Sequence, residues 1–261
     1  MASSAPAQPL RGRAVLVTRS TRQAEKLAWL IGEAGGEAVL FAALAIESPA
    51  DPAPVRQVLA GLASFDLGVF VSSNAVEHGL ALLGGAWPAE VPAAAVGEGT
   101  AATLRQHGIA SVIVAPGGAD SESLLATPQL KSLRGKRVLI LRGEGGREVL
   151  ADQLRQRGAE VAYAECYRRL RPRTDPAALI ARWEQGGLHA VTVMSGETLD
   201  NLWGMLGSRG RPLLRATPLF VPHANIAQRA AGLDLTEVAI TPPGDEGVLR
   251  GLSAWFSLHA R

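Results

Sequence analysis

The chain repeats part of its own sequence at a fixed offset of 123 residues. Arg11–Arg19 reads Arg-Gly-Arg-Ala-Val-Leu-Val-Thr-Arg, and Arg134–Arg142 reads Arg-Gly-Lys-Arg-Val-Leu-Ile-Leu-Arg. Further along, the same offset aligns single residues: Gly35 with Gly158, Glu37 with Glu160, and Ser72 with Ser195. A period this long is far beyond that of a solenoid repeat, so the pattern predicts two copies of one domain.

Each copy alternates short apolar runs with stretches of helical periodicity. Arg13–Thr18 is an apolar run of the kind that forms a buried parallel strand. Gln23–Glu33 places its apolar residues at helical spacing, and Gly35-Gly36 ends that helix. This alternation predicts an α/β fold made of two doubly wound parallel-sheet lobes.

The stretch Val161–Arg173 is predicted to carry the chain from one lobe to the other. It begins as a strand with Tyr163, Glu165 and Tyr167 on one face. No βα turn follows this strand, because the chain runs instead into a basic stretch that contains proline. We interpret it as one arm of a hinge, with Tyr167 directed at whatever lies between the lobes.

Composition limits the classes of protein that fit. The 261 residues suffice for two domains of about 120–130 residues each. A formal net charge of +2 does not argue for nucleic acid as a partner. The single cysteine, Cys166, excludes an internal disulfide, and no histidine has metal-ligand spacing with another histidine or with Cys166. We therefore expect no metal site.

The chain has no apolar run near the roughly 20 residues that span a membrane. Its N-terminus, Met1–Pro9, has the composition of a disordered tail and lacks the pattern of a secretory signal. We therefore expect a soluble cytoplasmic protein.

Small hydroxyl residues and glycines follow nearly every predicted strand. In a doubly wound sheet, ligands bind at the carboxyl ends of the strands, where the next helix presents backbone N–H groups. The candidate binding residues at these ends are Thr18, Arg19, Ser72, Ser73, Asn74, Gly99, Thr100, Arg142, Gly143, Ser195, Gly196, His223, Ala224 and Asn225. Two interpretations stay open: these residues bind an anion together, or the polar ones are helix N-caps and the arginines form ion pairs within the chain.

Motifs for common chemistries are absent. The sequence has no Gly-x-Ser-x-Gly nucleophile motif and no phosphate loop that ends in Gly-Lys-Ser/Thr. Gly97-x-Gly99-x-x-Ala102 fits a dinucleotide fingerprint only superficially, because it does not open the first βα unit of its domain. The pattern favours a site for a bulky polyanion, rich in backbone donors and poor in catalytic groups. A two-lobed binding protein for an anionic solute and a nucleotide-dependent transferase remain as alternatives.

Five short pieces of the chain form a pattern by their order and spacing: Val15–Arg19, Phe70–Val76, Val96–Ala101, Ser121-Glu122 before Leu124-Leu125, and Leu141–Gly143. Through these pieces the chain resembles the uroporphyrinogen-III synthase family over residues 12–256. Tyr167 falls in the family's returning linker, and Ser195 stands where the family has a strand-end serine. The chain departs from the family at Met194–Glu197, where a Thr-Ser-Pro-like turn is usual, and at Asn225, where a basic residue is often seen.

The resemblance implies flavodoxin-like lobes joined by a two-stranded β-ladder hinge. Residues 1–38 and 171–261 would form one lobe, residues 48–160 the other lobe, and residues 39–47 and 161–170 the linker. The first βα unit, residues 12–38, would then pack in the lobe formed by the end of the chain.

The resemblance also implies an activity. It is that of a cofactor-independent lyase of porphyrin (heme) biosynthesis, which cyclises hydroxymethylbilane to uroporphyrinogen III with loss of water and inversion of the last pyrrole ring. Ser121 and Glu122 would join the substrate-binding residues, and Tyr167 would assist the departing hydroxyl. The implied partners are the linear tetrapyrrole and, transiently, the enzyme that forms it. We expect a monomer that binds neither nucleic acid nor membrane.

Overall fold

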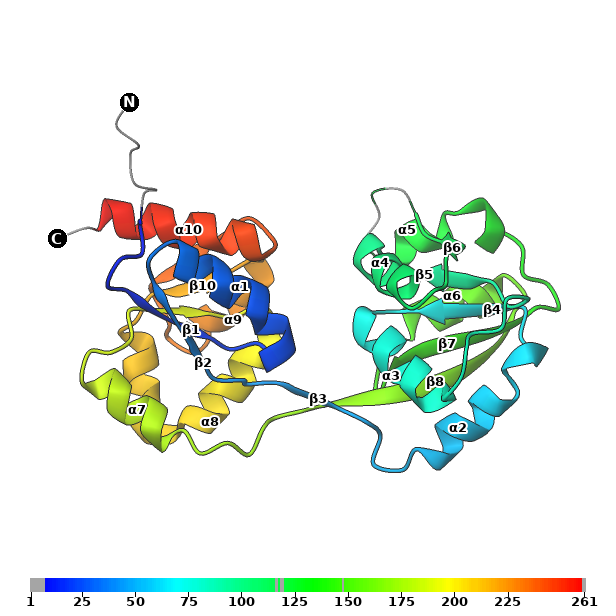
Figure 1. Cartoon of the computed structure of the whole chain (residues 1–261), viewed down its shortest axis with the longest axis horizontal. Coiled ribbons are helices and arrows are strands. Elements are labelled where there is room, and N and C mark those ends of the chain that lie inside the picture. Colours follow the sequence, from blue (N-terminus) through cyan, green and yellow to red (C-terminus); the bar gives the residue numbers. More distant parts are fainter. Residues whose placement is uncertain (1–7, 116, 118–119, 147, 260–261) are drawn as a thin grey trace. The chain divides into compact units, whose positions relative to one another are not determined.

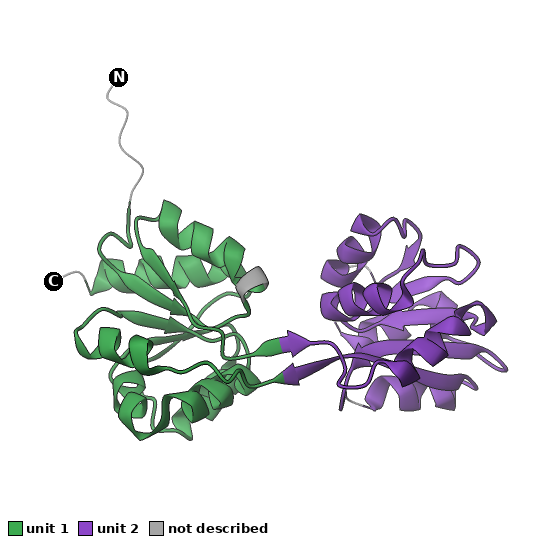
Figure 2. Ribbon diagram, turned by 60° about the horizontal axis from the view of Figure 1, so that its bottom comes forward, with its two compact units in different colours: residues 1–45, 170–261 green, residues 46–169 purple. Residues whose placement is uncertain are grey.

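The computed structural model describes residues 8–115, 117, 120–146 and 148–259 (Figure 1). Most of the predicted tail, Met1–Ala7, lies outside the described residues. The chain divides into two compact units, which Figure 2 colours separately. Unit 1 comprises Met1–Ala45 and Leu170–Arg261, and unit 2 comprises Ile46–Arg169. Each unit is described by itself.

Unit 1 contains a five-stranded sheet in the order β11-β10-β9-β1-β2, and all its strand pairs are parallel. The strands are β1 (Ala14–Val17), β2 (Glu37–Leu40), β9 (Ala190–Thr192), β10 (Leu219–Val221) and β11 (Val238–Ile240). Helices α1 (Thr21–Glu33) and α10 (Asp245–Leu258) cover one face, and α7 (Ala177–Glu184), α8 (Gly196–Arg215) and α9 (Ala224–Ala231) cover the other.

Alternation along β1 builds both cores of unit 1. Val15 and Val17 pack under α1 and α10, whereas Ala14 and Leu16 pack under α7, α8 and α9. All four residues are buried, which explains why the strand is a continuous apolar run.

Unit 2 contains a six-stranded sheet in the order β3-β8-β7-β4-β5-β6. Its strands are β3 (Ala45–Glu47), β4 (Leu67–Phe70), β5 (Ala93–Ala95), β6 (Val112–Ile113), β7 (Arg137–Gly143) and β8 (Glu160–Leu170). Helices α2 (Ala53–Ala60), α3 (Ser73–Leu83) and α4 (Glu98–Gln106) cover one face, and α5 (Ser121–Leu125) and α6 (Val149–Gln156) cover the other. Two short 3-10 turns complete the unit, η1 (Leu62–Ser64) and η2 (Pro128–Leu130).

The two sheets have the same strand order, as a duplication predicts. When the additional edge strand β3 of unit 2 is left out and the strands are numbered within each copy of the repeat, both orders read 2-1-3-4-5, which is the flavodoxin-like arrangement. Each sheet joins the first two strands of one copy to the later strands of the other copy, because β1 pairs with β9 and β7 pairs with β4. The predicted fold class is therefore confirmed.

Single hydrogen bonds also recur at the repeat offset. The backbone N–H of Ala14 donates to His189 Nδ1 over 3.0 Å, and the backbone N–H of Arg137 donates to Asp66 Oδ2 over 2.8 Å. The accepting side chain belongs to the residue just before β9 or β4, and the donating N–H belongs to the first residue of the neighbouring strand β1 or β7. Histidine and aspartate thus perform the same task in the two copies.

The prediction for the faces of β8 is wrong beyond Glu165. Glu165 lies opposite Arg142 and Tyr167 lies opposite Gly143, with a register shift between these two pairs. The shift is a β-bulge, in which an extra residue turns the strand and ends strict alternation. Tyr163 therefore packs toward the α5 and α6 face, whereas Tyr167 packs with Cys166 under α2, α3 and α4.

Candidate functional site

The candidate site follows from the topology of each sheet. In doubly wound sheets the ligand crevice lies where successive helices go to opposite faces. In unit 2 this point lies between β4 and β7, because α3 and α6 cover opposite faces. In unit 1 the equivalent point lies between β1 and β9, which precede α1 and α8.

The serines after β4 and β9 are helix N-caps. Ser72 Oγ accepts the backbone N–H of Ala75 over 3.1 Å, and Ser195 Oγ accepts the backbone N–H of Thr198 over 3.1 Å. Both serines have extended backbone angles, as N-caps do. Each oxygen is therefore already held by its own helix, and it can offer a ligand only its hydroxyl proton or a second lone pair.

Helices α1, α4 and α9 are among those that begin without a side-chain cap. The N-cap residues Ser20, Gly97 and His223 of α1, α4 and α9 make no capping hydrogen bond from the side chain. A Cβ on Gly99 would meet nothing within 4 Å, so there is open space at the first turn of α4. First-turn N–H groups without partners attract anions.

Several predicted residues come together at these strand ends. In unit 2, Thr103 Oγ1 on α4 donates to Ser73 Oγ on α3 over 3.0 Å, which ties Ser72–Asn74 to Gly99-Thr100. In unit 1, Ser195-Gly196 and His223–Asn225 follow the neighbouring strands β9 and β10, and the latter three residues are exposed.

Other predicted residues do not join them. Thr18 is fully buried, and its hydroxyl donates to the backbone oxygen of Thr192 over 2.7 Å. Ser121 and Glu122 begin α5, which follows the edge strand β6 and so lies away from the junction of β4 and β7.

Both strand-end arginines form ion pairs within their own unit. Arg19 contacts Asp245 over 2.6 Å. Arg142 is only 8% exposed and contacts Glu148 over 2.8 Å and Glu165 over 3.0 Å. Burial lowers the pKa of Arg142, but the two carboxylates outweigh burial, so the pKa is raised. A ligand carboxylate would have to displace these partners.

Tyr167 lies inside unit 2. It is 3% exposed, its hydroxyl lies 3.1 Å from Ser72 Oγ, and its ring lies 5.9 Å from the His78 ring. A Cβ on Gly143 would come within 2.6 Å of the Tyr167 ring, so glycine is the residue that leaves room for it. The contacts with Ser72, His78 and Gly143 were not predicted, because no local pattern reports contacts between distant residues.

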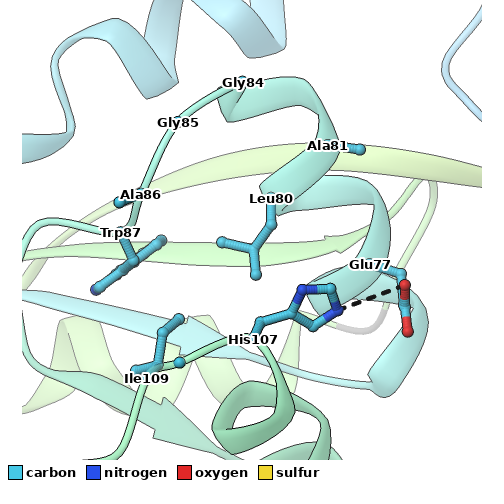
Figure 3. Close-up of a pocket in the computed structure, with 10 residues that line it drawn as sticks. Glu77, Leu80, Ala81, Gly84, Gly85, Ala86, Trp87, His107 and Ile109 are labelled. Atoms are coloured by element: carbon cyan, nitrogen blue, oxygen red, sulfur yellow. Dashed lines mark ion pairs between the residues drawn. The ribbon is translucent and has the colours of Figure 1, made fainter.

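Among the described residues, cavities lie at two places in unit 2 that the following residues define. The first, of about 510 Å³, lies between the end of α3 and the end of α4, where Glu77 and His107 approach to 3.6 Å (Figure 3). It opens at the C-terminal ends of these helices, away from Ser72 and Gly99 at their N-terminal ends. The second, of about 430 Å³, is lined in part by Arg142 and Tyr163.

Within the described residues, no group of three or more His, Cys, Asp or Glu side chains could hold a metal ion. No helix in the described part of the chain is long and apolar enough to cross a membrane.

The fold and these strand ends define a class of protein: two doubly wound α/β units whose candidate sites consist of helix N-termini, hydroxyls and glycines. A family model described as "Uroporphyrinogen-III synthase HemD" matches residues 25–247. The chain belongs to the uroporphyrinogen-III synthase family.

Individual relatives agree with this assignment. The chain is 33% identical to uroporphyrinogen-III synthase of Salmonella typhimurium over 244 residues, 91% of this chain and 99% of the relative. It is also 33% identical to uroporphyrinogen-III synthase of Escherichia coli over 245 residues, with the same coverage.

Solved structures agree on the fold. A mutant uroporphyrinogen III synthase of Thermus thermophilus has a TM-score of 0.61 at 20% identity, covering 96% of this chain and 100% of that one. A uroporphyrinogen-III synthetase of Helicobacter pylori has a TM-score of 0.58 at 19% identity, covering 95% of this chain and 100% of that one.

Proposed function

We propose that this protein is a uroporphyrinogen-III synthase, a cyclising lyase of tetrapyrrole biosynthesis. It converts hydroxymethylbilane to uroporphyrinogen III and water, and it inverts the last pyrrole ring. The observation that carries the proposal is the family match, which extends over residues 25–247 and includes relatives 33% identical over 91% of the chain. A binding protein for an anionic solute is not favoured by these relatives.

The chemistry of the substrate suits the strand ends. Every pyrrole ring of hydroxymethylbilane carries carboxylate side chains, so the molecule is a large polyanion. Taken separately, the first turn of α4 in unit 2 and the first turns of α1 and α9 in unit 1 would hold carboxylates through backbone N–H groups and the positive ends of the helix dipoles. Ser73 and Asn74 at the start of α3 would add hydrogen bonds in unit 2, and Ser195 and Asn225 at the starts of α8 and α9 would add them in unit 1. Each unit would thus recognise part of the charge that is distributed over the substrate.

The reaction needs positioning more than strong acids or bases. A pyrrole nitrogen supplies an electron pair that expels the terminal hydroxyl, so the C–O bond breaks and its electrons leave with oxygen. The resulting azafulvene cation is attacked by the substituted carbon of the last ring, which forms a spiro intermediate. The bond from this carbon to its original bridge carbon then breaks, and the unsubstituted α-carbon of the same ring attacks the released bridge carbon. Loss of the proton from that α-carbon restores the pyrrole and leaves the ring inverted. The protein must hold the linear chain so that this carbon attacks first.

Tyr167 is the proposed hydrogen-bond donor to the departing hydroxyl. A phenol hydrogen bond would ease departure by about 10- to 100-fold, because the low end of general acid catalysis is near 10²-fold and the pyrrole nitrogen already drives the step. Tyr167 is 3% exposed, so only a small part of it can contact the substrate. We propose that this part is the hydroxyl, which lies beside Ser72 at the start of α3.

We further propose that the protein is a cytoplasmic monomer that needs no metal or cofactor and binds neither nucleic acid nor membrane. Its partners would be the linear tetrapyrrole and, transiently, the enzyme that forms this substrate.

Two measurements test the proposal. The protein is incubated with enzymatically generated hydroxymethylbilane, and the products are separated by chromatography. We expect isomer III, and isomer I alone, the spontaneous product, would reject the proposed activity. Tyr167→Phe should still give isomer III about 10- to 100-fold more slowly. Full turnover in this variant would mean that the phenol only packs the core, and release of isomer I would mean that it shapes the substrate.

A further inference from the structure

We infer that Ser72 is a positioning residue for Tyr167: its hydroxyl holds the phenol oxygen and leaves the phenol proton for a ligand oxygen. The inference deepens the proposed function and rests on it for the identity of the reaction. The contact itself is a property of the folded chain. Oγ of Ser72 and the Tyr167 hydroxyl lie 3.1 Å apart, although the residues are 95 positions apart in the sequence.

The helix fixes the orientation of Ser72. Its Oγ accepts the backbone N–H of Ala75 over 3.1 Å, which uses one lone pair. The serine can still donate its proton to Tyr167, or it can accept the phenol proton on its second lone pair. Because the N–H of Ala75 belongs to the first turn of α3, the serine oxygen also lies at the positive end of a helix dipole.

A ligand oxygen would select one of these two arrangements. When the phenol donates to a ligand, its oxygen is free to accept the serine proton. Three donors then point in one direction, from the Ala75 N–H to Ser72, from Ser72 to Tyr167, and from Tyr167 to the ligand. Hydrogen bonds aligned in this way polarise one another and strengthen the last donor. No proton needs to be transferred along the series.

Neighbouring residues hold the phenol ring in place. Gly143 lies opposite Tyr167 across the β-bulge, and a Cβ there would come within 2.6 Å of ring atom Cε2. His78, on the same helix as Ser72, lies against the ring at 5.9 Å between centroids. The other tyrosine, Tyr163, makes different contacts, since its hydroxyl donates to Glu148 and accepts from Arg155.

The repeat provides a matched control within the same molecule. Ser195, at the repeat offset from Ser72, caps α8 through the same 3.1 Å bond to a backbone N–H. Its Oγ also lies 2.8 Å from the hydroxyl of Thr198. Both tyrosines of the chain, Tyr163 and Tyr167, lie in unit 2. Replacing Ser195 therefore removes a helix cap from unit 1 and leaves the contacts of Tyr167 within unit 2 unchanged.

The first test needs no activity. In Tyr163→Phe protein, Tyr167 is the only tyrosine, so the intensity ratio of the tyrosine doublet in the Raman spectrum reports the hydrogen bonding of its phenol. We expect Ser72→Ala to change this ratio, Ser72→Thr to retain it, and Ser195→Ala to leave it unchanged. Urea unfolding of each variant identifies conditions in which all are folded. An unchanged ratio in folded Ser72→Ala protein would overturn the inference, whatever the activity.

The second test is a double-mutant cycle on turnover. Ser72→Ala should lower kcat by about 3- to 10-fold, the effect of one hydrogen bond, with a smaller change in KM, and Ser72→Thr should recover most of the loss. In Tyr167→Phe protein the same serine change should lower kcat by less than about 2-fold, because the group it positions is gone. Equal losses in both backgrounds would mean that Ser72 acts independently, and the inference would fail. A changed Raman ratio in protein that makes no isomer III would instead reject the proposed function and leave the contact intact.

Discussion

A methyl group at position 143 should strain the core around Tyr167. The Cβ of an alanine there would lie 2.6 Å from Cε2 and 2.7 Å from Cζ of the ring, well inside van der Waals contact. The ring cannot move away easily, because Tyr167 is 3% exposed and its backbone is paired with that of Gly143. Overpacking of this kind costs about 1–3 kcal/mol, so we expect Gly143→Ala to unfold at a lower urea concentration by that amount.

Equilibrium urea unfolding measures the effect, and Gly32→Ala is its control. Gly32 lies within α1 and a Cβ there would meet nothing within 4 Å, so this change should stabilise by roughly 0.5–1 kcal/mol. Combining Gly143→Ala with Tyr167→Leu should cost less than the sum of the single changes, because the smaller side chain leaves room for the methyl group. Wild-type stability of Gly143→Ala, or strict additivity in the double variant, would refute this account of the glycine.

Three further predictions concern charged and reactive side chains. Burial lowers the pKa of His189, and its Nδ1 accepts the Ala14 N–H only when that nitrogen is deprotonated. The stabilisation by this residue is therefore present above about pH 6.5 and is lost as the pH falls through the lowered pKa of the folded state. Urea unfolding midpoints measured from pH 8 to 5 should show this loss in the wild type and a smaller loss in His189→Asn. Arg142→Ala should destabilise by roughly 2–3 kcal/mol in urea unfolding, because it empties a site that is only 8% exposed and removes the contacts of Arg142 with Glu148, Glu165 and the Tyr163 ring. Arg19→Ala removes one ion pair of a more exposed side chain and should cost about 1 kcal/mol or less, and equal costs of the two changes would contradict this explanation. Burial raises the pKa of the Cys166 thiol to about 12, so iodoacetamide at pH 8 should label unfolded protein and spare native protein, as mass spectrometry would show.

The sequence was sufficient to predict the fold class because the repeat and the apolar runs are local signals. The match of Arg11–Arg19 to Arg134–Arg142 marks equivalent first strands, which are β1 and β7 of the structure. Buried parallel strands need apolar residues on both faces, so they appear in the sequence as continuous apolar runs. No local pattern in the sequence shows that the first strands of each copy pair with the later strands of the other copy. This pairing was expected only from the family resemblance.

The candidate site could be predicted less completely, because its details depend on distant contacts. Strand-end serines were identified correctly as cap candidates, but the sequence did not indicate that Ser72 would also reach Tyr167. The partners of Arg142, Glu148 and Glu165, become neighbours only when β7 and β8 pair. The bulge that turns Tyr167 toward the core has no distinct pattern in a strand of alternating residues.

The number of isomer III molecules formed per protein molecule tests the central claim most directly. Hydroxymethylbilane is generated enzymatically in large excess over this protein, and isomers III and I are quantified by chromatography as the protein concentration is varied. The proposed synthase should produce many equivalents of isomer III per protein, at a rate proportional to protein concentration. At most one equivalent of isomer III, with isomer I forming at its spontaneous rate from the remaining substrate, would show binding without catalysis and would contradict the account.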